Sequence, residues 1–336
     1  MDLRIVAVCA VLAARPAFGA GVPATPAASR GLVGSWTAGV PEDRADRMYL
    51  SLHMGSHEHS SSTFDRSQFT GLTSAQVNSA TRVQVEFELR REAGTIAFEG
   101  LFRDGRGAGE FTFVPNRELP RMLRSLGVEF TSKRGSEDEE LFTLAMFDVS
   151  TDFIRSLQAV GYTVPLEQYE QFRIFDVNPK YVREMAATGF DHLSAEKLVE
   201  TRIHGASPEY IREMRAAGND LSLDEYIQSR IFQITPEFAA EMGRAGYTNL
   251  DHDMLVQFRI HGVTPAFVRE IRQLGYSRVP AEDLVAMRIH GVTPEFIRRV
   301  EAAGYRKVPV EKLVQMRIFN IEPEMVKALD QGDRPD

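Results

Sequence analysis

The hydrophobic pattern divides the chain into a part with alternating apolar and polar positions and a longer part with the spacing of helices. Alternation with a period of two is typical of half-buried β-strands. It occurs in the segments 48–53, 83–89, 95–102 and 110–114. We therefore expect residues 31–116 to form a small β-rich domain, an antiparallel sheet or sandwich of roughly five to seven strands.

A glycine-rich stretch, 104–109, joins the last two of these segments. Its first pair, Asp104 and Gly105, favours a tight turn with positive φ, so the stretch is expected to be a hairpin loop. A loop that cradles a dinucleotide or a phosphate lies between a strand and a helix. Because a strand follows here instead, the stretch does not predict a cofactor site.

Three histidines, His53, His57 and His59, lie within seven residues of one another. Three imidazoles can hold Zn²⁺ or Cu²⁺ when a loop brings them together. Their spacing is not that of an H-E-x-x-H helix, in which two histidines share one face with a glutamate between them. We interpret the segment as a polar, serine-rich loop between two strands, and we keep metal binding as an alternative.

From about residue 117 onward the sequence repeats itself every 28–29 residues. Each regular copy begins with a proline that suits the first helical turn and, in all but the last, has Tyr or Phe two positions later. A glycine then ends this helix, and an Arg-Ile pair recurs near the end of a second one. Such self-similarity predicts an array of stacked repeats. The prolines are Pro179, Pro208, Pro236, Pro265, Pro294 and Pro323.

The copy that begins at Thr293 explains how each unit forms two helices. Thr293 is a suitable N-cap, Pro294 fits the first helical position, and Glu295 places an acid at the positive end of the helix dipole. Gly304 provides a left-handed stop, and a second segment with apolar residues at helical spacing covers 311–318. Since one such pair cannot bury its apolar stripe alone, the copies must stack on one another.

The fold class that follows is an α+β multidomain protein, in which the small antiparallel β-domain precedes an α-solenoid of two-helix repeats. We expect seven repeats and a terminal half repeat over residues 117–331, with a degenerate first copy and a tail at 332–336. A charged insertion in the first copy, residues 131–140, is expected to be an exposed loop.

The N-terminal segment has the pattern of an export signal. Arg4 precedes the apolar run 5–14, and small residues follow up to Ala20. The run is too short to cross a bilayer, which takes about 20 residues. We expect a signal peptide over 1–20, a linker over 21–30, and a mature protein that is periplasmic or secreted and has no stable membrane span. An uncleaved anchor is the alternative.

Composition excludes several classes of partner and chemistry. The chain has 39 Lys and Arg against 47 Asp and Glu, a net charge of −8, whereas nucleic acid and anionic lipid require a basic surface. The single cysteine, Cys9, precludes a disulfide framework or a cysteine-based zinc site. No nucleophile or phosphate motif stands out, so we expect no catalytic residue, no cofactor and no enzyme, but a protein or peptide partner.

The repeated arginines admit two interpretations. In the last turn of the second helices they would complement the negative helix end and bond the carbonyls or acids of a neighbouring helix. Alternatively, they would bind carboxylates of a partner peptide. Tyr247, Tyr276 and Tyr305, which follow the glycines, fill the turns between helices or line a binding face. The candidate binding residues are these tyrosines and Arg173, Arg202, Arg230, Arg259, Arg288 and Arg317.

Copies such as LVAMRIHGVTP (284–294) and HGVTPEFIRRVEAAGY (290–305) resemble the helical repeats of exported or membrane-attached bacterial proteins. In that family the repeats often lie C-terminal to beta-lactam-sensor metallopeptidases of the BlaR/MecR-like kind. The segments REAGTIAFEG (91–100) and GRGAGEFTFVPN (105–116) resemble a small β-domain that precedes such repeats. The resemblance implies architecture only, because the sequence has no H-E-x-x-H helix that would carry the peptidase activity.

Three functional hypotheses follow from the sequence. The leading one is a non-catalytic exported scaffold that binds a protein or peptide on its repeat surface. The second is a regulatory or sensor component of a BlaR-like envelope signalling system. The third is a metal-binding protein that uses His53, His57 and His59.

Overall fold

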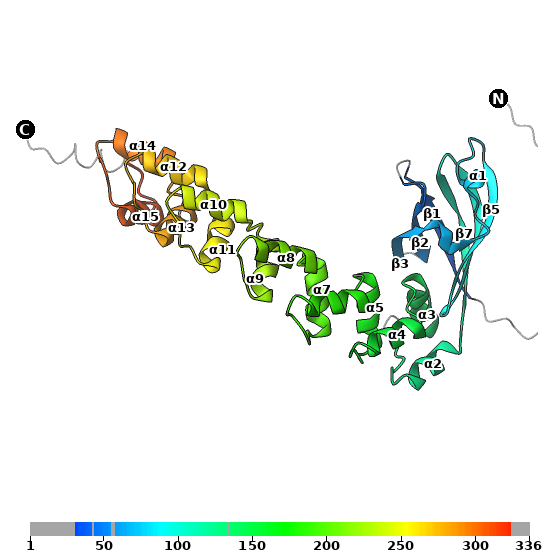
Figure 1. The fold of residues 1–336 in the computed structure, drawn as a ribbon. Coiled ribbons are helices and arrows are strands. Elements are labelled where there is room, and N and C mark those ends of the chain that lie inside the picture. Colours follow the sequence, from blue (N-terminus) through cyan, green and yellow to red (C-terminus); the bar gives the residue numbers. More distant parts are fainter. Residues whose placement is uncertain (1–30, 42–43, 55–57, 133–134, 324–336) are drawn as a thin grey trace, which may run out of the picture. The chain divides into compact units, whose positions relative to one another are not determined.

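The computed structural model describes residues 31–41, 44–54, 58–132 and 135–323. The expected signal peptide and linker, nearly all of the half repeat and the tail lie outside these residues. The described chain forms two compact units, one of residues 31–90 with 94–115 and the other of residues 91–93 with 116–323. Figure 1 shows the first unit as a curled sheet and the second as a row of helices.

The first unit is an antiparallel sheet with seven strands among the described residues. Their order is β3-β2-β1-β7-β6-β5-β4. The first and last strands of the unit, β1 and β7, are therefore antiparallel neighbours in the middle of the sheet. The expected small antiparallel β-domain is therefore confirmed. The strands are β1 (Leu32–Gly39), β2 (Arg47–Met54), β3 (Glu58–Asp65), β4 (Phe69–Thr70), β5 (Val83–Arg91), β6 (Gly94–Arg103) and β7 (Arg106–Pro115), and a short helix, α1 (Ser74–Val77), precedes β5.

The core of the sheet is built around Trp36 of β1. The centroid of its ring lies 5.3 Å from that of Phe87, edge-on, and 5.6 Å from that of Phe102. Its Nε1 donates a 3.1 Å hydrogen bond to the main-chain oxygen of Glu99. Edge-on ring pairs are favoured by the ring quadrupoles, and the bonded indole leaves no buried donor unsatisfied. The apolar positions of the alternating segments thus face one aromatic core.

The loop in the glycine-rich stretch 104–109 is shorter than the sequence predicted. Only Asp104 and Gly105, with φ of 48° and 74°, form the turn, and the residues from Arg106 onward belong to β7. Gly107 is required in this strand for a packing reason. A Cβ there would lie 2.7 Å from the ring of Phe102 and 2.8 Å from that of Trp36. Gly107 therefore lets β7 approach the aromatic core closely.

The loop that we expected over the histidine segment 53–59 is shorter than expected, because β2 continues to Met54 and β3 begins at Glu58. The serine-rich part that follows belongs to β3. It pairs with β2 over its whole length, and the register places Ser51 opposite Ser61 and His53 opposite His59. The hydroxyl groups of Ser51 and Ser61 lie 3.1 Å apart and share a hydrogen bond. The expected loop was too long because a polar strand shows no apolar alternation, while cross-strand hydroxyl pairs still stabilise it.

In its described residues the second unit contains fourteen helices, which lie between residues 119 and 318. They form seven pairs, as the repeat pattern predicted, and the fold class is confirmed. None of the helices in the described ranges is long and apolar enough to cross a bilayer. The helices are α2 (Leu119–Ser125), α3 (Glu137–Met146), α4 (Thr151–Gln158), α5 (Leu166–Ile174), α6 (Pro179–Ala186), α7 (Ala195–His204), α8 (Pro208–Ala216), α9 (Leu223–Ile231), α10 (Pro236–Arg244), α11 (His252–His261), α12 (Pro265–Gln273), α13 (Ala281–Ile289), α14 (Pro294–Ala302) and α15 (Val310–Ile318).

The local signals of each repeat act as expected. The Thr293 side chain accepts a 3.2 Å hydrogen bond from the Phe296 amide, and Pro294 occupies the first position of α14. Gly304 ends the repeat's first helix with a φ of 105°, a left-handed conformation that glycine adopts at little cost. The same cap by Ser or Thr, followed by proline, opens α8, α10 and α12.

Stacking of like helices holds the repeats together. Along the row in Figure 1, each second helix contacts the next second helix, from α5 through α7, α9, α11 and α13 to α15. First helices contact each other likewise in the pairs α6–α8 and α12–α14. One cluster of buried apolar side chains runs without interruption from Phe238 to Leu313. This shared core is what a solenoid of individually unstable helix pairs requires.

The charged insertion, expected to be a loop over 131–140, is partly helical. Its last four residues, all acids, form the first turn of α3, which begins at Glu137. Ser136 and Glu139 form a reciprocal capping box with the backbone. Carboxylates at this end are favoured by the helix dipole. The charge density that suggested a loop is therefore a helix-opening signal.

Candidate functional site

The six predicted arginines form a row, one in each of six second helices, which we call the arginine row. Each guanidinium lies over the aromatic ring at the third position of the first helix in its own repeat. The distance from the guanidinium carbon to the ring centroid is 3.8 Å for Arg202 over Tyr181 and 5.2 Å for Arg288 over Phe267. The pairs are Arg173–Phe153, Arg202–Tyr181, Arg230–Tyr210, Arg259–Phe238, Arg288–Phe267 and Arg317–Phe296.

The arginine row also reaches the end of the preceding second helix. Arg202 donates to the main-chain oxygen of Asp176 at 2.6 Å, and Arg259 does the same to Gln233 at 2.6 Å. At the start of the row, Arg173 instead donates to the carboxylate of Asp148 at 3.0 Å. These carbonyls lie at the negative end of a helix dipole, so the cation fits them electrostatically. Arg288 donates in the same way to the main-chain oxygen of His261 at 3.1 Å, so these four arginines each join two consecutive repeats.

The cost of burying these guanidinium groups is visible at Arg173. Burial is the largest influence and lowers the pKa of Arg173 from its usual value, while the negative charge of Asp148 raises it. An arginine keeps its proton throughout the range in which proteins are folded. The charge is therefore retained, and it is compensated by the ring of Phe153 and the carboxylate of Asp148.

The predicted tyrosines lie in the seams between repeats. The Tyr247 hydroxyl donates to the main-chain oxygen of Val279 at 2.6 Å, and that of Tyr276 donates to Val308 at 2.7 Å. Burial raises the pKa of both phenols. Tyr305 packs on the same apolar cluster as its two counterparts. Tyr247 and Tyr276 therefore each join the turn between the two helices of one repeat to the same turn of the next repeat.

The sequence analysis missed a regular exposed feature beside the arginine row. The isoleucine that follows each arginine points outward, with 43% to 53% of its surface exposed. Each isoleucine follows an arginine of the arginine row, whose side chain contacts other parts of the repeats. The helices that carry these isoleucines contact one another in sequence. We call these six residues the isoleucine row: Ile174, Ile203, Ile231, Ile260, Ile289 and Ile318.

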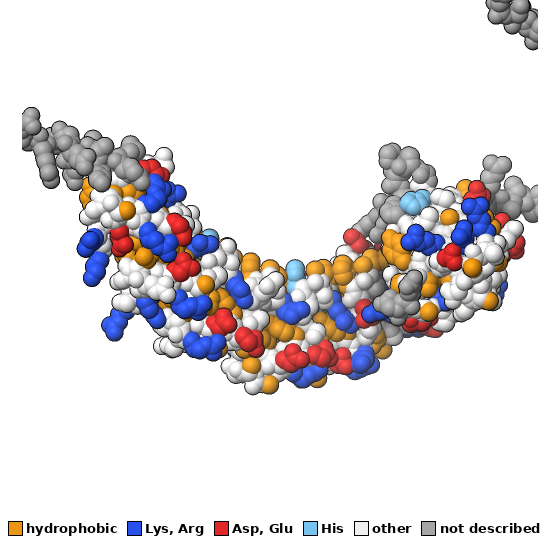
Figure 2. Space-filling model, turned by 90° about the horizontal axis from the view of Figure 1, so that it is seen from above, with side chains coloured by type: hydrophobic (Ala, Val, Ile, Leu, Met, Phe, Trp, Pro, Cys, Tyr) orange, Lys and Arg blue, Asp and Glu red, His pale blue; other side chains and the backbone are white. Residues whose placement is uncertain are grey.

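Two polar rows share the exposed face of the second helices with the isoleucine row. Positions seven and three residues before an isoleucine lie on its side of the helix, because those spacings match the helical period. Figure 2 shows one face of the molecule, on which hydrophobic side chains lie between charged ones along the repeats. The acid row is Glu167, Glu196, Asp224, Asp253, Glu282 and Glu311. The amide row is the four glutamines Gln171, Gln228, Gln257 and Gln315, and the equivalent positions of the other two helices hold Glu200 and Ala286.

A cavity of about 500 Å³ lies in the helical unit near the start of α5. Two buried carboxylates, Glu140 and Glu170, line it. Both residues have interaction partners within the protein. We do not assign the pair a catalytic role.

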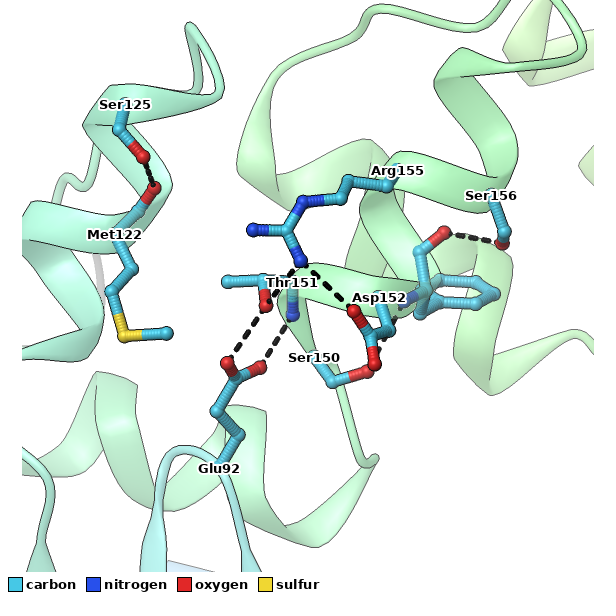
Figure 3. Close-up of polar contacts among 9 residues, drawn as sticks. Glu92, Met122, Ser125, Ser150, Thr151, Asp152, Arg155 and Ser156 are labelled. Atoms are coloured by element: carbon cyan, nitrogen blue, oxygen red, sulfur yellow. Dashed lines mark hydrogen bonds and ion pairs between the residues drawn. The ribbon is translucent and has the colours of Figure 1, made fainter.

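A separate polar contact caps the helix α4 (Figure 3). Glu92 accepts hydrogen bonds from the amide of Thr151 at 2.5 Å and from its hydroxyl at 2.7 Å. Arg155 donates to the same hydroxyl at 3.3 Å and to Asp152 at 2.9 Å. A carboxylate at a helix N-terminus satisfies free amides and the positive dipole end. This arrangement is a structural cap.

The histidine segment lies only partly within the described residues. His53 is exposed on β2, while His57 and the side chain of His59 lie outside what the structure describes. Among the described residues, no group of three potential ligands is close enough to hold a metal ion. Metal binding through these histidines stays an untested alternative.

Comparisons of the chain with protein-family models, with curated proteins and with solved structures each find no match. The resemblance to the repeats of exported bacterial proteins stays a prediction from the sequence motifs. The functional proposal therefore depends on the geometry of the repeats.

Proposed function

We propose that the protein is a non-catalytic exported scaffold whose helical repeats bind another protein or a peptide. The observation that carries this proposal is the isoleucine row. Isolated exposed apolar residues are ordinary on protein surfaces, but a row on adjacent, equivalent helices is typical of an interaction surface. Repeat proteins use such extended surfaces to hold partners along their length.

The arginine row and the tyrosines contribute to binding as positioning residues in this proposal. Their rings, guanidinium groups and hydroxyls fasten neighbouring repeats to one another, as with Arg259 on Phe238 and Tyr276 on Val308. Fixed spacing between repeats keeps the isoleucines in one line. A preorganised surface binds more tightly because less freedom is lost on association.

Affinity capture tests the proposal. The mature chain is immobilised and exposed to an envelope extract, in parallel with the variant that carries Ile231→Ser and Ile260→Ser. We expect a protein that the unaltered chain retains and the variant does not, and direct binding of the two purified proteins should reproduce that difference. Equal retention of every protein by both forms would contradict the proposal.

A second candidate function is supported by the sequence motifs alone. Copies such as HGVTPEFIRRVEAAGY (290–305) resemble repeats that accompany beta-lactam sensors of the BlaR/MecR-like kind. A regulatory or sensor role would make the captured partner an envelope protease or a sensor. A gene for such a sensor or its repressor beside this one favours this role. A partner unrelated to signalling would argue against it.

A further inference from the structure

We propose that the isoleucine row binds an extended, positively charged polypeptide segment that carries an apolar side chain at every third residue. This inference rests on the proposed function and deepens it. It assigns the binding surface, the backbone conformation of the bound segment and the sign of its charge. Three features of the second helices lead to it.

The spacing of the isoleucine row favours an extended partner. The second helices α5, α7, α9, α11, α13 and α15 contact one another in sequence, and packed helices lie about 8–10 Å apart. A polyproline II segment has three residues per turn and returns to the same face about every 9.3 Å. In a β-strand the same face recurs about every 6.8 Å, so a strand would lose register within a few repeats.

The amide row favours the same conformation. A glutamine side chain both donates and accepts hydrogen bonds. An extended segment leaves its own amides and carbonyls available, whereas a helix uses them internally. Gln228 and Gln257 lie three residues before Ile231 and Ile260, on the same side of their helices. The Oε1 atom of Gln257 also shares a 3.1 Å hydrogen bond with Nε2 of His261. The backbone of an extended partner on the isoleucines would thus pass beside groups that can bind it.

The acid row determines the charge of the partner. All six members are exposed, and each lies in the first turn of its helix. Asp224 is bonded at 2.8 Å to Lys197, which also contacts Glu200 at 2.6 Å. Glu311 accepts a 3.4 Å hydrogen bond from Gln315. The neighbouring guanidinium groups lie over rings and carbonyls of the repeats themselves, as Arg202 does over Tyr181. Complementarity with the acids therefore requires Lys or Arg on the partner.

Peptide binding to the full chain tests the inference. The probe is a fluorescent synthetic peptide of Leu-Pro-Lys triplets, one for each of the six isoleucines. We expect its fluorescence anisotropy to rise on binding, and the Ile231→Ser, Ile260→Ser variant to bind it about tenfold more weakly. The control variant Leu101→Ser removes an equally exposed apolar residue from β6 and should bind as the unaltered chain does.

Matched peptides separate the parts of the inference. A peptide of the same composition in which the residues are ordered as Leu-Leu, Pro-Pro and Lys-Lys pairs lacks a leucine at every third position, and it should bind at least about tenfold more weakly. A peptide with Glu in place of Lys should not bind. Preferential binding of an amphipathic helical peptide would overturn the extended conformation. If no peptide binds while capture retains an isoleucine-dependent protein, this inference fails and the proposed function stands. If capture fails as well, both fail.

Discussion

The guanidinium carbon of Arg259 lies 3.8 Å from the ring centroid of Phe238, and its Nη2 donates to the main-chain oxygen of Gln233 at 2.6 Å. The ring belongs to the first helix of the same repeat, and the carbonyl to the end of the preceding one. One side chain therefore connects three helices. Arg202 and Arg288 make the same two kinds of contact, which makes the arginine row a major connection between units.

Replacement of this arginine should loosen two repeats at once. A partly buried cation–π contact contributes about 0.5–2 kcal/mol, and a hydrogen bond from a charged group about 1.5–3 kcal/mol. We expect Arg259→Ala to lower the free energy of unfolding of the helical unit by about 2–4 kcal/mol. Urea unfolding followed by circular dichroism of the helices measures this. The exposed Arg269 is the control, and its replacement by Ala should change stability by less than about 0.5 kcal/mol.

Two glycines distinguish backbone strain from contact with the arginine row. Gly262 and Gly275 both have positive φ, 69° and 91°. A Cβ on Gly262 would lie 2.9 Å from Nη2 of Arg288, whereas nothing lies within 4 Å of one on Gly275. We expect both Gly→Ala variants to be less stable by about 1 kcal/mol or more, and Gly262→Ala to lose more. Equal losses in urea unfolding would mean that the guanidinium moves aside freely.

Loss of a tyrosine hydroxyl should weaken one seam. Tyr276→Phe leaves the ring in place but removes the donor to the Val308 oxygen. We expect a loss of about 0.5–1.5 kcal/mol, with more if the carbonyl stays buried without a partner. Tyr49→Phe in the exposed part of β2 is the matched control and should have no measurable effect. A thermal unfolding midpoint that is the same for both variants would contradict the role of this hydrogen bond.

Acids that open the first helices should make the helical unit sensitive to low pH. Backbone hydrogen bonds at the helix N-terminus are the largest influence on Glu209, Glu237 and Glu295, and they lower the pKa of each below 4.5. A pKa that is lower in the folded state stabilises the fold above the unfolded value, and this contribution is lost as pH falls through the folded value. Stability should thus decrease below about pH 4.5. The triple Glu→Gln variant should show a weaker decrease, and an unchanged pH profile would contradict this assignment.

The repeat architecture was predictable because its signals are local. Asn, Ser or Thr before proline, and glycine about ten residues later, determine where the first helix begins and ends in five consecutive copies. Strands with a polar surface, such as β3, were not predictable because their stability comes from pairing rather than from apolar alternation. The contact of Arg202 with Tyr181 was also hidden, since it joins residues of two helices whose packing must be known first.

The candidate binding surface shows the same limit. The helical spacing of apolar residues in the second helices includes Ile231 and Ile260, so the sequence does not distinguish them from residues of the core. Whether such a residue faces the core or solvent depends on how the next repeat stacks, which the sequence does not state. The sequence therefore directed attention to the arginines and tyrosines, and the exposed isoleucine row emerged from the packing.

Hydrogen–deuterium exchange of the full chain, with and without the captured partner, tests the central claim most directly. Binding on the isoleucine row should slow exchange in the second helices of the central repeats, above all over Leu223–Ile231 and His252–His261. First helices such as Pro236–Arg244 should change less. Slowing that is confined to the β-sheet unit, with no change in the second helices, would contradict the account.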